Sequence, residues 1–320
     1  MTLISIGKLR GLQQCTSPQG TFTCLALDHR QNLRQALRPQ DPSTVTDAEL
    51  SGFKLEVTSA LAGSATAVLL DPEVSAAQAI AAGVLPGPVG LVVALEATGY
   101  VGEPTARRSQ ILPGWSVEKA RRMGAAMVKL LVYYHPKSPT AAQIEDFVRR
   151  VADDCRRLDL GLMLEPLSYP LEAGSALSSA DKRFVVTETA RRLVVPGVDI
   201  LKAEFPLDAL VDEDEQAWAA ACAEISTASP APWILLSAAV NYERYVRQVT
   251  VACEAGASGI AVGRAVWQEA VGLQGQARLD FLQTTARKRL TRLAGLCSRL
   301  ARPVQRIYSA EAPFDWYKNY

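Results

Sequence analysis

Histidine is nearly absent from this 320-residue chain, which contains only His29 and His135. A zinc site of three histidines therefore cannot be assembled from it. The six cysteines are scattered and form no CxxC pair, so we expect reduced thiols packed in the interior. No apolar run approaches the ~18 residues that cross a bilayer, and residues 1–11 lack the long apolar core of a signal peptide. These absences predict a soluble cytoplasmic protein.

An excess of charge of either sign is also lacking. Lys and Arg number 34 and Asp and Glu number 33, a net charge of +1, which leaves no electrostatic footprint for nucleic acid or an anionic membrane. No low-complexity stretch and no linker rich in Gly, Ser and Pro divides the chain. Hydrophobic residues make up 48% of the sequence, enough for a large core. Length alone would suggest two domains, but α/β barrels often exceed ~250 residues as one domain.

The chain does contain eight short apolar runs rich in Val, Ile and Leu. Amphipathic segments separate them, which is typical of parallel strands covered by helices. Eight strands, each followed by a helix, predict an α/β fold, a single (β/α)₈ TIM barrel. We expect one domain over 1–320, with an N-terminal extension at 1–20, the barrel at 21–300 and a C-terminal tail at 301–320. The runs lie at 21–29, 65–72, 89–97, 125–134, 161–169, 198–206, 231–238 and 257–265.

Four segments between or after these runs carry apolar residues at helical spacing. In the segment 139–158 the apolar residues recur every three or four positions. Ser138 is predicted to cap this helix and Pro139 to occupy its first turn. The other predicted helices cover 181–193, 242–254 and 279–296.

Polar or phosphate-binding residues stand near the end of every run. A TIM barrel places its chemistry at the carboxyl ends of its strands, so these residues are candidates for one shared site. From the fourth run to the seventh they are about 35 residues apart, the length of one strand–helix unit. In chain order they are Asp28, Asp71, Glu96, Lys129, Glu165, Lys202, Ser237 and the pair Gly263-Arg264.

The lysine in VDILKAEFP (198–206) is unusual, because lysine is almost never fully buried without a partner. Facing outward, Lys202 would lie under a helix, a poor environment for an ammonium group. A lysine in a strand can also pair with a nearby carboxylate and perform no chemistry. A second strand lysine, Lys129, and two carboxylates at matching depth, Asp28 and Glu165, favour a catalytic role.

Burial and a second cation both disfavour the charged form of a lysine, so the pKa of Lys202 is expected to fall. Its neutral amine could attack a ketone and form a Schiff base, whose iminium stabilises the carbanion left when the adjacent carbon–carbon bond breaks. Lys129, held protonated near a carboxylate, would supply the second cation. Glu165 can accept and donate protons during imine formation, and Asp28 can hold a substrate hydroxyl or the proton of the leaving alkoxide.

A phosphate site is predicted where the last two strands end. The seventh run leads through Ser237 and Ala238 into a helix, and the eighth ends in Gly263 and Arg264. The loops after strands seven and eight are the usual phosphate site of this fold. Gly263 lets the backbone approach the anion, helix N–H groups point at it, and Arg264 adds a bidentate cation.

At this point the chain resembles a known family, the class I tagatose-1,6-bisphosphate aldolases, whose relatives include the sulfofructose-phosphate aldolases. The resemblance covers roughly residues 20–270 and is most specific in VDILKAEFP. The motifs that carry it are ALDHR (26–30), GWSVEKAR (114–121), VKLLVYY (128–134), LMLEPLSY (162–169), VDILKAEFP (198–206), LLSAAV (235–240) and VGRAVW (262–267).

The resemblance implies a metal-independent, cofactor-free aldolase of carbohydrate metabolism with Lys202 as its Schiff-base lysine. Glu165 and Lys129 would be acid–base neighbours of that lysine, and Asp28 the first-strand residue. Ser237 and Arg264 would hold the 1-phosphate of a ketose, or of dihydroxyacetone phosphate after cleavage. The implied partners are a phosphorylated ketose and dihydroxyacetone phosphate, with a homo-oligomer as a further expectation.

Two departures from the family pattern bear on the sugar. The family commonly has glutamine where His29 stands and a small residue where Gln31 stands, and it commonly has glycine where Ala239 stands. The first change could alter recognition of the substrate hydroxyls or of its distal end. The second is mild, because alanine keeps its backbone N–H.

The distal end of the substrate needs its own cation, and strand-end loops offer four candidates. Each could equally be a solvated charge, and a 6-phosphate and a 6-sulfonate fit the sequence equally well. The candidates are Arg30, Arg107, Arg108 and His135.

Two other functions remain open. One is a different Schiff-base aldolase, acting on deoxyribose phosphate or a keto acid, and the other is a non-catalytic barrel that binds sugar phosphates. The aromatic end of the chain, 311–320, is either a packed tail or dimer contact, or a tail that folds over the barrel mouth.

Overall fold

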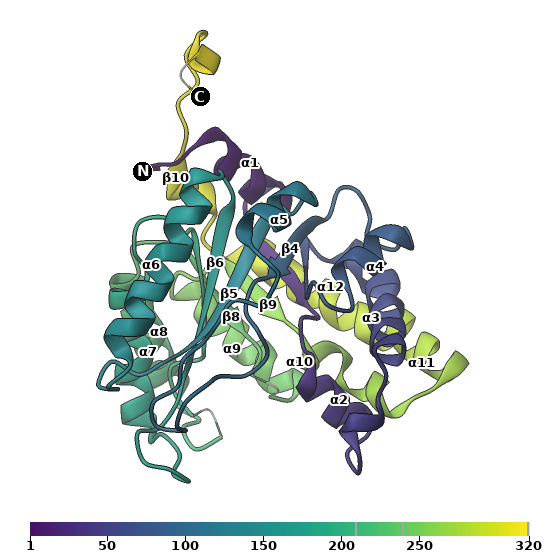
Figure 1. Cartoon of the computed structure of the whole chain (residues 1–320). Helices are drawn as coiled ribbons and strands as arrows, with labels where there is room; N and C mark the ends of the chain where they lie inside the picture. The colour runs from purple at the N-terminus through teal and green to yellow at the C-terminus, as the bar shows by residue number, and fades with distance from the viewer. Residues whose placement is uncertain (209, 239, 319) are drawn as a thin grey trace.

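Eight parallel strands close into a barrel in the computed structural model, which describes residues 1–320 except Ala209, Ala239 and Asn319. Each strand pairs with the next in chain order, and the last pairs with the first, so the predicted TIM barrel is confirmed. All eight predicted runs contain their strand (Figure 1). The strands are β2 Phe22–Ala26, β3 Ala67–Leu70, β4 Gly90–Ala94, β5 Met127–Tyr134, β6 Gly161–Ser168, β7 Ile200–Ala203, β8 Trp233–Leu236 and β9 Gly259–Val262.

Alternate strand residues face the barrel interior, which holds its own apolar core. Ile200 packs in this inner core, whereas Leu201 and Ala203 pack in the outer core beneath the helices. Because side chains alternate with a period of two, Lys202 faces inward from β7. The same alternation places Asp28, Lys129 and Glu165 on the inner face, after Ala26, Met127 and Met163 of the inner core.

Helices cover the outside of the barrel and bury their apolar faces in the outer core (Figure 1). Helix α9, Tyr242–Glu254, matches its prediction, and α7, Ser179–Leu193, begins two residues early. The other helices are α1 Ile6–Cys15, α2 Gln31–Leu37, α3 Asp47–Leu61, α4 Ala76–Ala81, α5 Val117–Arg122, α6 Ala141–Arg157, α8 Glu215–Ala228, α10 Arg264–Trp267, α11 Gly275–Phe281 and α12 Arg287–Leu300.

Two helix predictions were wrong in detail. Helix α6 begins at Ala141 because the Ser138 N–H closes a turn on the His135 carbonyl (2.9 Å). The Ser138 hydroxyl then accepts from the Thr140 N–H, before the helix, instead of capping its first turn. The segment 279–296 is divided by a π-helical turn at Leu282–Ala286, which separates α11 from α12.

The amino end of the barrel is closed by both chain termini. Strand β1 (Thr2–Leu3) pairs with β10 (Tyr308–Ser309), and α1 crosses the strand starts. Gly11 of α1 packs so close to the start of β5 that a Cβ there would lie 2.4 Å from the Ala126 carbonyl oxygen. The C-terminal tail leaves the body from this end, so it does not fold over the mouth of its own barrel (Figure 1).

The six cysteines are buried and carry free thiols, as expected. Within the part of the chain that the structure describes, no helix is both long enough and apolar enough to cross a membrane.

Candidate active site

The nine residues predicted to form the site line one cavity of about 470 Å³ at the carboxyl ends of the strands. They come from six of the eight strands or from the loops that follow them, which is how a TIM barrel assembles a site from distant parts of the chain. The nine are Asp28, Arg30, Lys129, Glu165, Lys202, Ser237, Ala238, Gly263 and Arg264.

Lys129 is the centre of the charged part of this cavity. Its side chain is fully buried, and its Nζ lies 2.6 Å from Asp28 Oδ2, 2.6 Å from Glu96 Oε1 and 3.1 Å from Glu165 Oε2. Three carboxylates therefore surround one ammonium group. Burial alone would lower the pKa of Lys129, but the three carboxylates raise it well above its ordinary value. Lys129 is therefore protonated at neutral pH.

Lys202 lies beside this group and shares one of its carboxylates. Its Nζ is 2.7 Å from Glu165 Oε1, and the residue is 4% exposed. Glu165 thus joins the two lysines, one on each oxygen. Burial would raise the pKa of Glu165, yet Lys129 and Lys202 hold it below its ordinary value. The same two lysines outweigh burial at Asp28, whose pKa is also lowered. Both carboxylates are therefore ionised at neutral pH.

Glu96 is a member of the site to which the sequence argument gave no role. Besides binding Lys129, it accepts a hydrogen bond from the Leu131 N–H (3.0 Å). Burial raises its pKa even though Lys129 acts in the opposite direction. Two features of the sequence point to Glu96. It follows the end of a strand, and it lies two residues after Ala94 of β4, which puts it on the same face as Ala94. An isolated bridge between Glu96 and Ile111 keeps the chain extended past the end of the strand, so the alternation still applies there.

The predicted phosphate side of the cavity has one unpaired cation. Among the residues that the structure describes, no carboxylate pairs with Arg264, and burial lowers its pKa. The Gly263 N–H donates to Ser237 Oγ (3.3 Å), which ties the last two strand ends together. A Cβ at Gly263 would lie 2.9 Å from the Ala26 carbonyl oxygen, so the position favours glycine.

Ala238 adopts a left-handed backbone conformation with φ of 37°. Non-glycine residues rarely do so, and such strain collects at functional sites. Ala239, where the family commonly has glycine, lies outside the described residues.

Arg30 reaches the cavity from the loop after β2 and is already engaged. Its guanidinium pairs with Glu73 and donates to the Glu96 carbonyl oxygen (2.8 Å). The loop that carries Glu73 is ordered by Asp71, which accepts from the N–H groups of Glu73 (3.0 Å) and Val74 (2.9 Å).

The expectation that Asp71 belongs to the site was wrong. It is fully buried and pairs with Lys54 of α3, and it does not line the cavity. Strand β3 ends at Leu70, so the inward alternation no longer applies at Asp71. Its role here is to order the loop beside Arg30.

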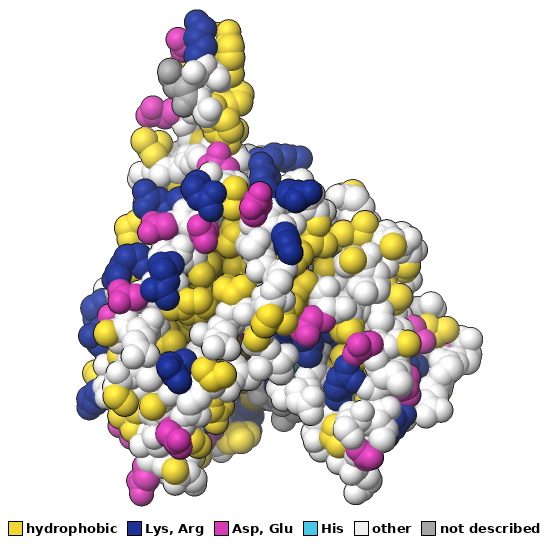
Figure 2. Space-filling view, in the orientation of Figure 1, with side chains coloured by type: hydrophobic (Ala, Val, Ile, Leu, Met, Phe, Trp, Pro, Cys, Tyr) yellow, Lys and Arg dark blue, Asp and Glu magenta, His cyan; other side chains and the backbone are white. Residues whose placement is uncertain are grey.

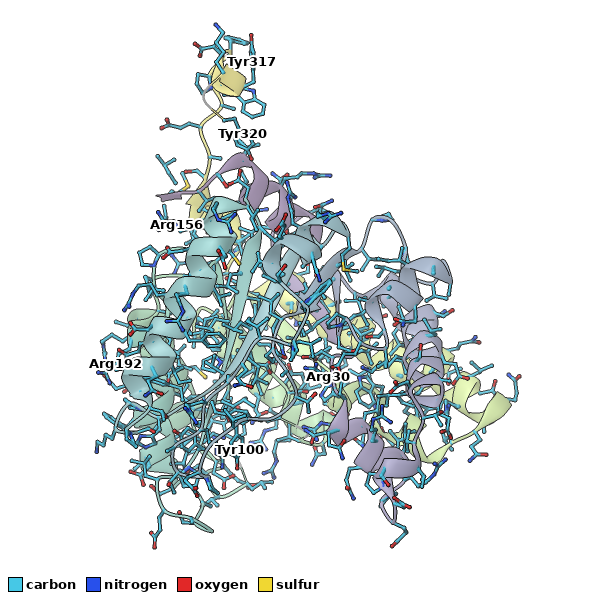
Figure 3. The ribbon with its side chains drawn as sticks, viewed as in Figure 1. Arg30, Tyr100, Arg156, Arg192, Tyr317 and Tyr320 are labelled. Carbon is cyan, nitrogen blue, oxygen red and sulfur yellow. The ribbon has the colours of Figure 1, made fainter. Side chains whose placement is uncertain are left out.

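The other three cations proposed for the distal anion do not line the cavity. Arg107 lies between three tyrosine rings, 4.6 Å from the centre of Tyr100, 5.3 Å from Tyr133 and 4.7 Å from Tyr169. Tyr100 and Arg30 are both labelled in Figure 3. His135 accepts at Nδ1 from the Lys137 N–H (3.1 Å), and Arg108 is exposed on the same loop as Arg107.

His29 is a neutral base that lines the cavity. Its ring packs edge-on against Trp267 at 5.4 Å, and its Nδ1 is buried with no hydrogen-bond partner among the described residues. Burial lowers the pKa of His29 to about 4; Asp28 opposes this shift and Arg264 supports it. The residue that replaces the usual glutamine is therefore uncharged at neutral pH.

A closed eight-stranded barrel with lysines and carboxylates at its carboxyl end defines an enzyme of the aldolase class, and comparison with known proteins agrees. The chain belongs to the DeoC/LacD family of aldolases, whose family model matches residues 22–269. It is therefore an aldolase, a carbon–carbon lyase. The resemblance found in the sequence motifs is confirmed.

Relatives with assigned names cover almost the whole chain. The tagatose 1,6-diphosphate aldolase of Listeria monocytogenes serotype 4a is 30% identical over 95% of each chain. Tagatose 1,6-diphosphate aldolase 2 of Enterococcus faecalis is 30% identical over 92% of this chain and 94% of its own. Among solved structures, an archaeal fructose 1,6-bisphosphate aldolase superposes with a TM-score of 0.60 at 24% identity, covering 91% of this chain and 99% of its own. That last likeness is one of fold.

Proposed function

We propose that this chain is a class I aldolase that cleaves a ketose 1,6-bisphosphate, such as tagatose 1,6-bisphosphate, into dihydroxyacetone phosphate and glyceraldehyde 3-phosphate. The observation that carries the proposal is the position of Lys202. Its amine is buried, faces the cavity, and lies 2.7 Å from a carboxylate that a second, protonated lysine helps to keep ionised. The names of the relatives support the choice of sugar.

Formation of the Schiff base begins with proton transfer from Lys202 to Glu165, which lies within hydrogen-bond distance. The neutral amine adds to the C2 carbonyl of the ketose and gives a carbinolamine. Glu165 then returns a proton to the C2 hydroxyl, which leaves as water, and an iminium remains on Lys202. Lys129 stabilises the ionised form of Glu165 when that carboxyl has given up its proton.

Cleavage of the carbon–carbon bond needs a base for the C4 hydroxyl. Asp28 is ionised and lines the cavity, so it takes this proton. The electrons of the C3–C4 bond move into the iminium, which becomes an enamine, and the C4–C6 fragment leaves as an aldehyde. Asp28 then gives the proton that it holds to C3 of the enamine, which regenerates the iminium. Addition of water to this iminium releases dihydroxyacetone phosphate and free Lys202.

The 1-phosphate belongs at the loops after β8 and β9. Arg264 is the cation there that has no carboxylate partner among the described residues, and Gly263 allows close approach of the backbone. Ser237 contributes its hydroxyl and Ala238 its backbone N–H, from the strained turn.

The distal anion belongs at Arg30, since it alone of the four candidate cations lines the cavity. Glu73 already neutralises part of its charge. A sulfonate carries one negative charge where a phosphate carries up to two, so this pairing favours a monoanion. That observation supports a second substrate, 6-deoxy-6-sulfofructose 1-phosphate, cleaved to dihydroxyacetone phosphate and sulfolactaldehyde by the same steps.

Borohydride trapping tests the proposal. With dihydroxyacetone phosphate, borohydride should reduce the iminium and leave a stable adduct that peptide mapping places on Lys202. An adduct on another lysine would overturn the assignment, and no adduct would favour a barrel that only binds sugar phosphates. Retro-aldol assays with tagatose and fructose 1,6-bisphosphates, the sulfosugar phosphate, deoxyribose 5-phosphate and a keto-acid substrate would then fix the substrate.

A further inference from the structure

The C-terminal residues 310–318 and Tyr320, here called the aromatic tail, project from the body of the protein. Its base is held by the β1–β10 pair, and its end returns to α1, where the Tyr320 hydroxyl accepts from the Gly7 N–H (3.0 Å). Between these points Trp316 packs edge-on against Tyr320 at 5.0 Å. Figures 1 and 3 show the tail standing away from the barrel, with Tyr317 at its far end.

The aromatic side chains of the tail are open to solvent. Phe314 is 106% exposed, Tyr317 64% and Tyr320 62%. Figure 2 shows hydrophobic side chains along one side of the projection. Ordering the tail costs about 1–2 kcal/mol of backbone entropy per residue, and it buries little apolar surface on its own body in return. Exposed aromatic residues held in this way indicate a surface that binds a partner.

A groove of about 460 Å³ opens beside the base of the tail. It lies at the amino end of the barrel, on the face opposite to the active-site cavity. Arg156, at one edge of this groove, is labelled below the tail in Figure 3. This groove, here called the floor groove, also has charged groups in its lining, among them Lys8 and Asp199. Its apolar lining includes Ile4, Val194, Val195, Pro196, Pro230 and Tyr308.

We propose that the aromatic tail of one copy binds in the floor groove of a second copy, and that two such contacts make a two-fold dimer. Tail and groove adjoin each other at the same end of the barrel, so pairing two amino ends about a two-fold axis brings each tail to the partner's groove. The tail is pinned to its own α1 at Tyr320, which directs its tip outward. Both active-site mouths stay open in this arrangement.

The surface available is sufficient for a stable dimer. Three exposed aromatic residues on each of two tails would bury about 100–200 Å² apiece, and the grooves about as much again. The sum reaches the total of roughly 1,200–2,000 Å² found in stable protein interfaces.

Light scattering after size exclusion tests the dimer at micromolar concentration. We expect the full chain to be dimeric and Phe314→Ser/Tyr317→Ser to be monomeric, with dissociation at least tenfold easier. Val195→Asp should act in the same way from the groove side. Ile80→Ser on α4 is the matched control, because it removes an apolar side chain that is 46% exposed elsewhere, and it should remain dimeric. Aldolase turnover should be the same in all four.

Cross-linking identifies what the tail touches, even if the groove variant fails to fold. The native cysteines are all buried, so Phe314→Cys and Pro196→Cys each add one reactive thiol. A bismaleimide added to a mixture of these two variants should join them, whereas neither variant alone should form the same product. A monomeric full chain, a dimer indifferent to the tail changes, or no mixed cross-link would each overturn the proposal.

Discussion

The floor of the barrel and its mouth both bury lysine against carboxylate, but they do so differently. At the floor, Lys8 has one carboxylate: its Nζ lies 2.7 Å from Asp199 Oδ2 and donates to the Gly197 carbonyl oxygen (3.0 Å). Asp199 in turn accepts from the Leu162 N–H at 2.8 Å. At the mouth, Lys129 meets three carboxylates, and one of them also holds Lys202.

The difference lies in how the partners are shared. The floor pair also borders a groove, but it contains a single carboxylate, its other hydrogen bonds go to backbone groups, and it ties α1 to the start of β7. The mouth cluster borders an open cavity, and a proton moved from one of its members to another is still held by a neighbouring charge. A buried lysine is therefore weak evidence for chemistry, and a shared network beside a cavity is much stronger evidence.

The largest expected effect is at Lys202. Replacing it by methionine (Lys202→Met) should lower kcat/KM by at least about 10⁴-fold, because the covalent step is lost. Borohydride should then leave no adduct at this position. Normal turnover by the folded variant would mean that the mouth cluster is structural like the floor pair.

The reverse effect is expected at the floor. Lys8→Met leaves Asp199 buried without its partner, which should lower the free energy of unfolding by about 3–5 kcal/mol. Urea titration measures this loss, and turnover per folded molecule should be unchanged. In Lys8→Met/Asp199→Leu, both charges are removed, so most of the stability should return. A large loss of turnover in the folded single variant would break the distinction between the two ends of the barrel.

Much of this contrast follows from the sequence, because strand periodicity decides which side chains face inward. The segment 198–206 and its counterparts predicted the eight strands, and alternation places Lys202, Lys129 and Glu165 in one space. The apolar residue two positions before each of them belongs to the inner core, so the inference depends on strand alternation and not on loop conformation.

The errors fall where the chain leaves its strands. Asp71 and Glu96 both follow the end of a strand, yet only Glu96 enters the cavity, because its bridge to Ile111 prolongs the extended chain. The pairing of Arg30 with Glu73 joins two loops 43 residues apart, and no periodicity reports such a contact. Position on a strand is readable from sequence, and loop conformation is much less so.

Acid should lower the free energy of unfolding through His29, at the mouth of the barrel. Below pH 6.5 the unfolded chain protonates this histidine, whereas the folded chain keeps it neutral until about pH 4. The unfolded state binds more protons over this window, so stability falls as pH falls, by roughly 2–3 kcal/mol from this residue. Urea midpoints of the wild type and His29→Gln at pH 7 and pH 4.5 measure it.

The histidine effect has a matched control. The glutamine variant should lose part of the acid sensitivity. Burial lowers the pKa of His135 as well, so His135→Asn measures how much of the remaining sensitivity comes from the second histidine. If the urea midpoint falls equally between pH 7 and pH 4.5 in the wild type and in His29→Gln, His29 is accessible to protons in the folded protein.

The smallest expected effect concerns Glu96, a strand-end candidate to which the sequence gave no role. Glu96→Gln keeps an acceptor for the Leu131 N–H but removes one of the three negative charges around Lys129. We expect kcat to fall about 10–100-fold, or about 1.4–2.7 kcal/mol. The carboxylates raise the pKa of Lys129, so losing one lowers it, and the alkaline limb of the pH–rate profile should move to lower pH. Glu103→Gln, an exposed change in the following loop, is the control. A slower enzyme with an unmoved alkaline limb would mean that Glu96 only packs against Lys129 and does not set its charge.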